Sequence, residues 1–215
     1  MKTPKRRFFI KCLATIPFVA SLDACSEKQE SGSDLTPTRN LKKDPKSMEL
    51  SQKMDKEDVL SMLDQRVVLT MEKCHNCAQT AFYVLSEQFG LGGDDVLKAL
   101  TPLPGIAERG ETCGAITGAL MAMGLIYGRD QLDDWETYRS SLVPTNDFVN
   151  QFEKELGSTQ CRNIQVRAFG KSFNLMDPED LKQFQRSGAT ARCSRVVQKA
   201  TRIAANIILD QAKKT

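Results

Sequence analysis

The sequence predicts an all-α fold: a compact helical domain with a buried central helix, preceded by an export signal and a flexible tether. Apolar residues recur at helical spacing in several segments, and no run of alternating β-branched residues is long enough to indicate a strand. The segment CGAITGALMAMGLIY, residues 113–127, is apolar on all sides except at Thr117. At 15 residues it is too short to cross a bilayer, so we expect it to be the central buried helix.

Two helices and a loop are predicted before this segment. The first helix follows the acidic residue Asp55. Its apolar face consists of Leu60, Leu63, Val67 and Met71. The second has an apolar residue at every fourth position and ends at Gly90. These positions are Cys77, Ala81, Leu85 and Phe89. Thr101 to Gly110 holds two prolines and two glycines, which predicts a loop.

Helices are also predicted after the apolar segment. An amphipathic stretch carries Phe148 and Phe152 and ends at Gly157, and we expect Pro144 to break the chain before it. Asp177-Pro178-Glu179-Asp180 predicts a helix start. The last helix has one apolar stripe, with its basic residues off it. The stripe consists of Cys193, Val196, Val197, Ala200, Ile203, Ala204, Ile207 and Ile208.

Residues 1–24 are predicted to be an export signal and not part of the fold. A basic head that includes Arg6 and Arg7 precedes an apolar run from Cys12 to Ala20. That run is too short to span a bilayer as a stable helix, which disfavours a transmembrane anchor. Residues 6–11, RRFFIK, resemble the twin-arginine signal, whose route exports folded proteins across the bacterial inner membrane. We therefore expect the protein in the periplasm or cell envelope.

A lipid anchor and a tether are expected next. Leu22-Asp23-Ala24-Cys25 resembles a bacterial lipobox, in which Cys25 would carry the lipid. Asp23 departs from that pattern, so simple cleavage nearby and an uncleaved anchor remain alternatives. Residues 25–54 are predicted to be a flexible tether, because polar residues and proline dominate residues 26–46. The helical cysteine domain is expected over residues 55–215.

Charge and residue content argue against two classes of function. Residues 1–24 hold five basic side chains and one acidic one, which leaves 25 basic and 26 acidic residues in the rest of the chain. A nearly neutral body gives no electrostatic reason to expect nucleic acid as a partner. The single histidine, His75, lies between two cysteines, so no Ser–His–Asp hydrolase arrangement is predicted.

The cysteines recur at predicted helix starts. Cys74 and Cys77 are expected to open one helix, Cys113 the next, and Cys193 the last, while Cys161 follows Gly157 and opens a short one. Helix N-termini carry partial positive charge and free N–H groups, which stabilise an anion and lower the pKa of a thiol. Five thiols at the inner ends of different helices are therefore expected to converge on one place.

The same residues resemble a known family. Cys74–Gln79, residues 110–129, Cys161 after residues 152–157, and Cys193 match four successive motifs, with Asn76 where the pattern has glycine. The pattern is that of the redox-active proteins named C_GCAxxG_C_C, which are related to a domain of split-Soret cytochromes. The resemblance covers residues 60–208. It implies a redox role for the cysteines.

Three hypotheses for the cysteines remain open at this point. The first is a metal centre, most plausibly an iron–sulfur cluster, used in electron transfer with a redox partner. Its ligands would be drawn from Cys74, Cys77, Cys113, Cys161 and Cys193. The second is thiol–disulfide exchange by Cys74 and Cys77, which have C-x-x-C spacing. The third is a set of structural disulfides without catalysis, such as Cys161–Cys193, in a binding or interaction domain.

Three smaller expectations complete the site. Covalent c-type haem is disfavoured, because its C-x-x-C-H motif needs histidine where Ala78 follows Cys77. His75 is a candidate metal or axial ligand, although a lone histidine in a surface turn is more often neither. Glu111 beside Cys113 is a candidate proton carrier, although an acidic residue in a first helical turn accounts for it equally simply.

Overall fold

The computed structural model describes residues 41–212, and within this range the chain is helical with no strand. The all-α prediction is confirmed for this range. The helices are α1 (Pro45–Lys53), α2 (Lys56–Cys74), α3 (Cys77–Phe89), α4 (Asp94–Ala99), α5 (Gly105–Glu108), α6 (Gly114–Tyr127), α7 (Trp135–Leu156), α8 (Cys161–Phe169), α9 (Pro178–Arg186) and α10 (Ala189–Ala212). The predicted signal with Arg6 and Arg7, the lipid site Cys25 and the first part of the tether lie outside the described residues.

The end of the predicted tether is part of the folded domain. Helix α1 begins after Asp44, whose side chain accepts a hydrogen bond from the Lys46 amide. Ser51 is buried and donates to the carbonyl oxygen of Gln88 at the end of α3. A flexible tether over the whole of residues 25–54 is therefore wrong for residues 45–53, because the Ser51 hydrogen bond and the packing of Met48 against the core hold α1 in the fold.

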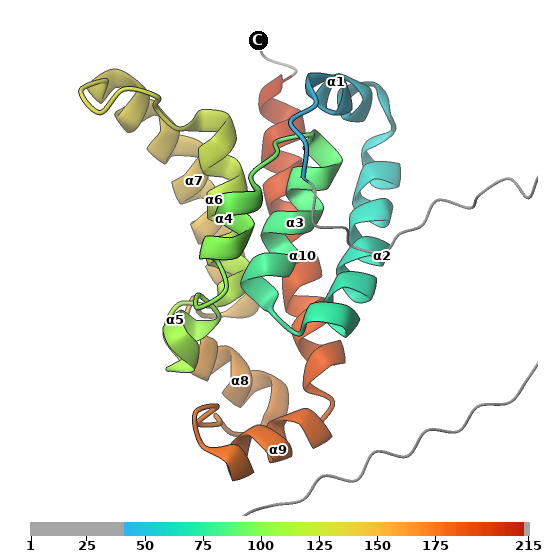
Figure 1. Cartoon of the computed structure of the whole chain (residues 1–215), viewed down its shortest axis with the longest axis vertical. Coiled ribbons are helices and arrows are strands. Elements are labelled where there is room, and N and C mark those ends of the chain that lie inside the picture. Colours follow the sequence, from blue (N-terminus) through green and yellow to red (C-terminus); the bar gives the residue numbers. More distant parts are fainter. Residues whose placement is uncertain (1–40, 213–215) are drawn as a thin grey trace, which may run out of the picture. The chain divides into compact units, whose positions relative to one another are not determined.

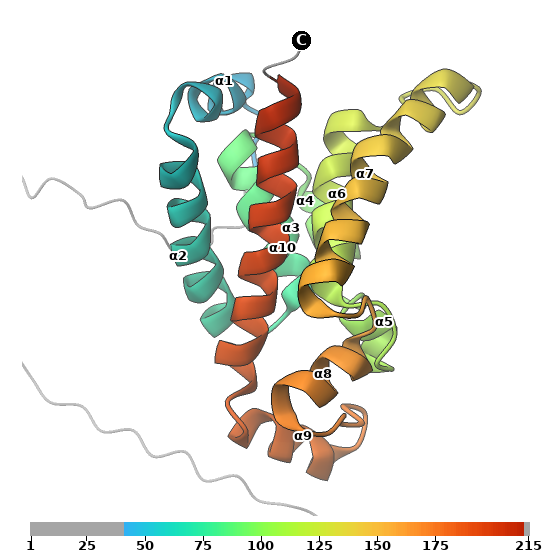
Figure 2. The same cartoon turned by 180° about the vertical axis from the view of Figure 1, so that it is seen from behind.

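The core lies between α2, α3, α6, α7 and α10. Helix α3 packs against α2, α6 and α10, and α10 runs between α2 on one side and α6 and α7 on the other (Figures 1 and 2). The predicted faces of α2 and α10 point into this core, as Leu63, Val67 and Val197 are fully buried. Asp55 caps α2, and Gly90 ends α3 in the left-handed conformation that glycine favours.

Helix α6 is only partly the buried central helix that its composition predicts. Ala115, Ala119 and Met123 are fully buried against α3, whereas Met121 and Leu125 on the opposite side are 45% and 46% exposed. The close contact depends on a missing side chain. A Cβ atom at Gly118 would lie 2.1 Å from the carbonyl oxygen of Ala78 on α3. Tight helix packing accounts for this glycine.

The predicted break at Pro144 is wrong, because α7 continues through it from Trp135 to Leu156. Proline removes one helical hydrogen bond and usually kinks or ends a helix. Here Pro144 is buried, and one and two turns later Phe148 and Phe152 are completely buried in the core. Packing of this apolar face offsets the local cost of proline.

The predicted loop at residues 101–110 contains a short left-handed turn, α5. Ile106, Ala107 and Glu108 all have positive φ, between 50° and 61°. Each such residue costs roughly 1–2 kcal/mol, so a run of them needs outside support. Support comes from the Arg162 guanidinium, which donates to the carbonyl oxygens of Arg109 and Gly110.

Helices α5, α8 and α9 lie at the end of the helix bundle where α2 turns into α3 and α10 begins (Figures 1 and 2). Asp177 caps α9, as the sequence predicts, by accepting from the amides of Glu179 and Asp180. Among residues 41–212, no helix is both long and apolar enough for a membrane span.

Candidate thiol centre

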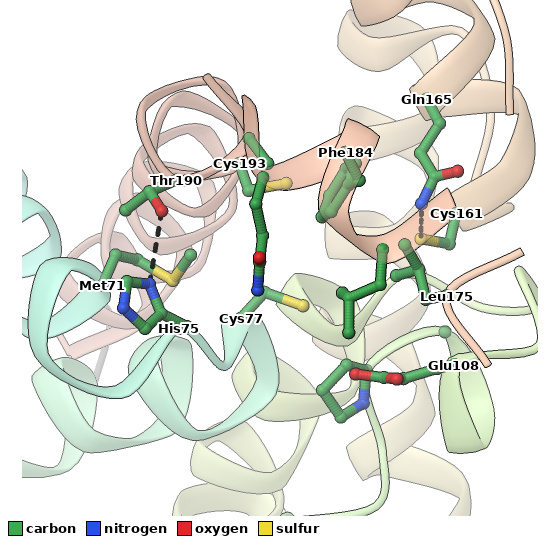
Figure 3. Close-up of a pocket in the computed structure, with 15 residues that line it drawn as sticks. Met71, His75, Cys77, Glu108, Cys161, Gln165, Leu175, Phe184, Thr190 and Cys193 are labelled. Carbon is green, nitrogen blue, oxygen red and sulfur yellow. Dashed lines mark hydrogen bonds between the residues drawn. The ribbon is translucent and has the colours of Figure 1, made fainter. Parts of the chain in front are cut away.

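A cavity of about 480 Å³ lies where the short helices meet the end of the bundle. Its walls come from the α2–α3 turn, the left-handed turn of α5, α8, α9 and the first turns of α10 (Figure 3). The lining residues are Met71, His75, Cys77, Pro104, Gly105, Glu108, Cys161, Gln165, Leu175, Leu181, Phe184, Gln185, Ala189, Thr190 and Cys193. Residues far apart in the sequence therefore form one site.

Three of the predicted cysteines lie on the cavity wall. Cys77 is the first residue of α3, and Cys161 is the first residue of α8, as predicted. Cys193 also lines the cavity, but the prediction that it opens the last helix is wrong by one turn, because α10 begins at Ala189. The sulfur atoms of Cys77 and Cys193 point toward Leu175 and Phe184 across the cavity (Figure 3).

Cys113 lies behind Cys77, buried at the N-cap of α6, and a Cβ atom on the next residue, Gly114, would lie 2.4 Å from the sulfur of Cys77. Two backbone hydrogen bonds fix the position of Cys113 beside α8. The Cys113 amide donates to the Thr159 carbonyl oxygen at 2.9 Å, and the Cys161 amide donates to the Glu111 carbonyl oxygen at 2.6 Å. The loop before α6 is thus paired with the loop before α8, and four thiols gather around one end of the domain.

Two helix N-termini act on the sulfur of Cys77. The hydrogen bond from the Cys113 thiol is the largest influence, and it lowers the pKa of Cys77 below its ordinary value. Burial opposes this change, while the backbone amides of Cys77, Ala78 and Gly114 support it. These amides belong to the first turns of α3 and α6, where N–H groups lack helical partners and can stabilise a thiolate. Cys77 is therefore the thiol most readily ionised among the four.

The other three thiols are held in the neutral form. The hydrogen bond to Cys77 and then burial raise the pKa of Cys113 well above its ordinary value. Burial raises the pKa of Cys161 to about 12, and burial also raises the pKa of Cys193. The negative charge that Cys77 can carry adds to these increases. One acidic thiol surrounded by three weakly acidic ones gives the site a single preferred nucleophile.

Gly114 allows the two helix starts to meet. A Cβ atom there would lie 2.4 Å from the sulfur of Cys77, 3.0 Å from the Ala78 amide nitrogen and 3.1 Å from the Cα atom of Pro104. Any larger residue would push Cys77 away from the amides that stabilise its charge. The absence of a side chain at Gly114 thus leaves room for the Cys77 sulfur, whereas at Gly118 it allows α6 to pack closely on α3.

Cys74 does not belong to the cavity, contrary to its predicted place beside Cys77. It is the last residue of α2, and His75 in the left-handed conformation separates it from α3. Its exposed thiol lies 3.2 Å from the Thr80 hydroxyl oxygen. The prediction that Cys74 and Cys77 open one helix and share its face is wrong, because the chain reverses between them.

The polar residues near the cysteines have different positions. His75 is on the cavity rim, where its Nδ1 atom lies 3.2 Å from the Thr190 hydroxyl oxygen. Glu111 is outside the cavity and pairs with Arg162 at 2.5 Å, so it supports the loop. Glu108 lines the cavity and was not among the predicted site residues. Its position depends on the left-handed turn, for which its neighbours Ile106 and Ala107 give no sequence signal.

The cysteine thiols of the cavity are suitable ligands for a soft metal, but their side chains are not positioned to hold one. Cysteine thiolates are the ligands of zinc and iron–sulfur centres. Among residues 41–212, no group of three or more Cys, His, Asp or Glu side chains is positioned to hold a metal ion. The cysteines in this range are free thiols, and Cys161 and Cys193 are not bridged. A metal would require the thiols on opposite cavity walls to turn toward one another.

The fold and site define an all-helical protein with a thiol centre at one end of its bundle. The sequence model of the family described as "Putative redox-active protein (C_GCAxxG_C_C)" matches residues 75–207, and the chain belongs to this family. The match includes Cys77, Cys113, Cys161 and Cys193, and it begins just after Cys74. No curated protein and no solved structure matches the chain.

Proposed function

We propose that the domain carries out thiol–disulfide exchange through Cys77 and Cys113. The position of the Cys77 sulfur against the first turn of α6 carries this proposal, because it brings an acidic thiol next to a buried second one: a Cβ atom on Gly114, the residue after Cys113, would lie 2.4 Å from that sulfur. Cys77 faces the cavity, where a substrate can reach it, and Cys113 is behind it. This is the order that an attacking thiol and a resolving thiol require.

The exchange has two balanced steps. The Cys77 thiolate attacks one sulfur of a substrate disulfide, a mixed disulfide forms, and the other substrate sulfur leaves as a thiolate. Cys113 then gives up its proton and attacks the sulfur of Cys77, which releases the second substrate thiolate. The two departing thiolates take up protons from Cys113 and solvent. The pair loses two electrons, the substrate gains two, and the reverse sequence reduces the protein.

A trapping experiment tests this assignment. The reduced full chain would be mixed with one equivalent of 2,2′-dipyridyl disulfide, and the peptides would be mapped by mass spectrometry. The wild type should form a Cys77–Cys113 disulfide and retain no pyridyl group at Cys77. Cys113→Ser should instead retain a pyridyl adduct at Cys77. A stable adduct at Cys77 in the wild type would show that Cys113 does not resolve it.

A thiolate-bound metal or iron–sulfur cluster is the second candidate. The observation that favours it is the convergence of four thiols from α3, α6, α8 and α10. Cys77, Cys113, Cys161 and Cys193 would be the ligands, and a cluster would supply one-electron transfer when bound. We rank this candidate second, because no three possible ligands lie ready to hold a metal ion within the part of the chain that the structure describes, residues 41–212.

Anaerobic purification of the full chain separates the two candidates. A visible spectrum and iron and zinc analysis would be made on the same sample. Several iron atoms per chain, with a broad absorption lost on oxidation, would favour the cluster. A colourless chain without metal would favour the exchange reaction.

We also propose export by the twin-arginine route and lipid attachment at Cys25, which would place the thiol centre near the outer face of the inner membrane. The basic head and the lipobox-like residues support this proposal. An Arg6→Lys, Arg7→Lys double variant should stay in the cytoplasm. A Cys25→Ala variant should be exported without incorporating labelled fatty acid.

A further inference from the structure

The cavity wall beside Cys77 is mainly apolar, and its one basic side chain is that of His75 on the rim. Its apolar lining includes Met71, Pro104, Leu175, Leu181 and Phe184. Figure 3 shows Met71, Leu175 and Phe184 among them. The lining includes neither lysine nor arginine. Binding sites for carboxylates and phosphates ordinarily use arginine or lysine. An anionic substrate would therefore find no lysine or arginine in this cavity, and the Nδ1 atom of His75 already lies 3.2 Å from the Thr190 hydroxyl oxygen.

The acidic and polar groups of the cavity point to the same ligand class. The Glu108 side chain lies on the wall and repels negative charge. The Gln165 side chain is already engaged: its amide nitrogen donates to the Cys161 sulfur, and its oxygen accepts from the Phe173 amide. Thr190 is paired with His75. Few polar groups remain to bind a strongly polar molecule.

The size of the cavity suits a small molecule rather than a peptide segment. A volume of about 480 Å³ lies within the ordinary range of ligand pockets, which runs from roughly 300 to 1,000 Å³. Such pockets combine apolar walls with a few polar groups that fix orientation. An uncharged molecule with a planar ring could pack on Phe184 and Leu175 while facing the sulfur of Cys77.

We propose that the oxidant of the thiol pair is an uncharged, mainly apolar small molecule of the quinone class, bound in this cavity. This inference rests on the proposed exchange by Cys77 and Cys113. A quinone accepts two electrons and two protons, which is what a dithiol releases when it becomes a disulfide. No other group is needed to balance the reaction.

The step proceeds through a transient carbon–sulfur bond. The Cys77 thiolate attacks a substituted ring carbon, and the displaced electron pair moves to a carbonyl oxygen. That oxygen takes the proton of Cys113, whose sulfur attacks Cys77. The sulfur–sulfur bond forms, the carbon–sulfur bond breaks, and its electron pair returns to the ring. One more proton from solvent completes the hydroquinone.

Duroquinone is a suitable probe, because its four methyl groups block the formation of a stable thioether by loss of a ring hydrogen. The reduced full chain would be mixed with it without oxygen, and loss of quinone absorbance would be followed at several quinone concentrations. We expect the rate of quinone loss to saturate with quinone concentration and one hydroquinone to form per Cys77–Cys113 disulfide. In the Cys77→Ser variant this disulfide cannot form, and we expect no quinone reduction by the remaining Cys113 thiol. Parallel samples would receive oxidised dithiothreitol.

Two matched variants test the cavity itself. Leu175→Glu places a carboxylate on the cavity wall, whereas Met176→Glu places the same charge on the next residue, which is 69% exposed and outside the lining. Leu175→Glu should raise the half-saturating quinone concentration about tenfold or more, which corresponds to at least about 1.4 kcal/mol of binding free energy. Met176→Glu should leave it unchanged.

The outcomes separate the two proposals. If oxidised dithiothreitol forms the Cys77–Cys113 disulfide but duroquinone does not, the exchange stands and the quinone assignment is overturned. A non-saturable quinone reaction, equal in both glutamate variants, would also overturn it. If no oxidant produces the Cys77–Cys113 disulfide, the proposed exchange and the quinone step both fall.

Discussion

Cys113 at the N-cap of α6 lies beside the sulfur of Cys77 at the start of α3, although 35 residues separate them in the chain. Each cysteine changes the ionisation of the other. The pKa of Cys77 is lowered and that of Cys113 is raised, so Cys77 is the more readily ionised thiol of the two.

Cys113→Ala should slow alkylation of Cys77 at neutral pH by about tenfold, since hydrogen bonds to charged groups contribute about 1.5–3 kcal/mol. The thiolate is the reactive form, and the lost hydrogen bond raises the pKa of Cys77. The alkylation rate measured against pH by peptide mass spectrometry should therefore move to higher pH. An unchanged profile would show that Cys113 does not stabilise the Cys77 thiolate.

The reduced protein should lose stability as the pH rises from 9 toward 12. The Cys161 thiol has its ordinary pKa of 9.0 in the unfolded chain, and burial raises this pKa to about 12 in the fold. A group with a raised folded pKa stabilises the fold below its unfolded pKa, and that contribution is lost as the pH climbs to the folded value. Cys161 should contribute a slope of up to about 1.4 kcal/mol per pH unit in the free energy of unfolding.

Urea unfolding of the reduced chain at several pH values between 9 and 11 measures this slope. Cys161→Ala should reduce it, and Cys74→Ala, which removes an exposed thiol, should not. Equal slopes in both variants would contradict the assigned burial of Cys161.

Gly118→Ala should lower the free energy of unfolding by about 1–3 kcal/mol, because the new methyl group would lie 2.1 Å from the Ala78 carbonyl oxygen. Gly124→Ala is the control on the same helix, since a Cβ atom there meets nothing within 4 Å. It should instead raise stability by about 0.5–1 kcal/mol through helix propensity. Chemical denaturation of both variants would compare the two effects, and similar losses at both sites would contradict the α3–α6 contact.

Cys74→Ser should leave formation of the Cys77–Cys113 disulfide unchanged in rate and extent. The thiol of Cys74 is exposed and lies against Thr80, and Cys74 does not line the cavity. Quenched thiol counting after addition of one equivalent of oxidant checks this. A loss of more than about tenfold in rate would restore the C-x-x-C interpretation of Cys74 and Cys77.

Helical periodicity predicted most of the fold and several site positions. The spacing of Leu63 and Val67, and the glycine at residue 90, correctly located α2 and the end of α3. Signals for helix starts also placed Cys77, Cys113 and Cys161 correctly at the beginnings of α3, α6 and α8, although they wrongly placed Cys74 in the same helix as Cys77. Periodicity works here because these helices bury one continuous face.

The features that were missed depend on contacts between distant residues. His75 adopts a left-handed conformation that divides Cys74 from Cys77, and no local glycine signals this reversal. Pro144 remains helical because the core holds the turns after it. The apolar cavity wall at Leu175 and Phe184 comes from a loop and a short helix, and it meets Cys77 only in the folded chain.

The central claim is that Cys77 and Cys113 form the redox pair, and a disulfide map at equilibrium tests it most directly. The full chain would be equilibrated without oxygen in buffers of reduced and oxidised dithiothreitol, quenched with acid, alkylated and mapped by mass spectrometry. The account predicts one reversible disulfide, Cys77–Cys113, that forms in a single two-electron transition while Cys74, Cys161 and Cys193 stay reduced. A first disulfide that joins Cys74 to Cys77, or Cys161 to Cys193, would contradict it.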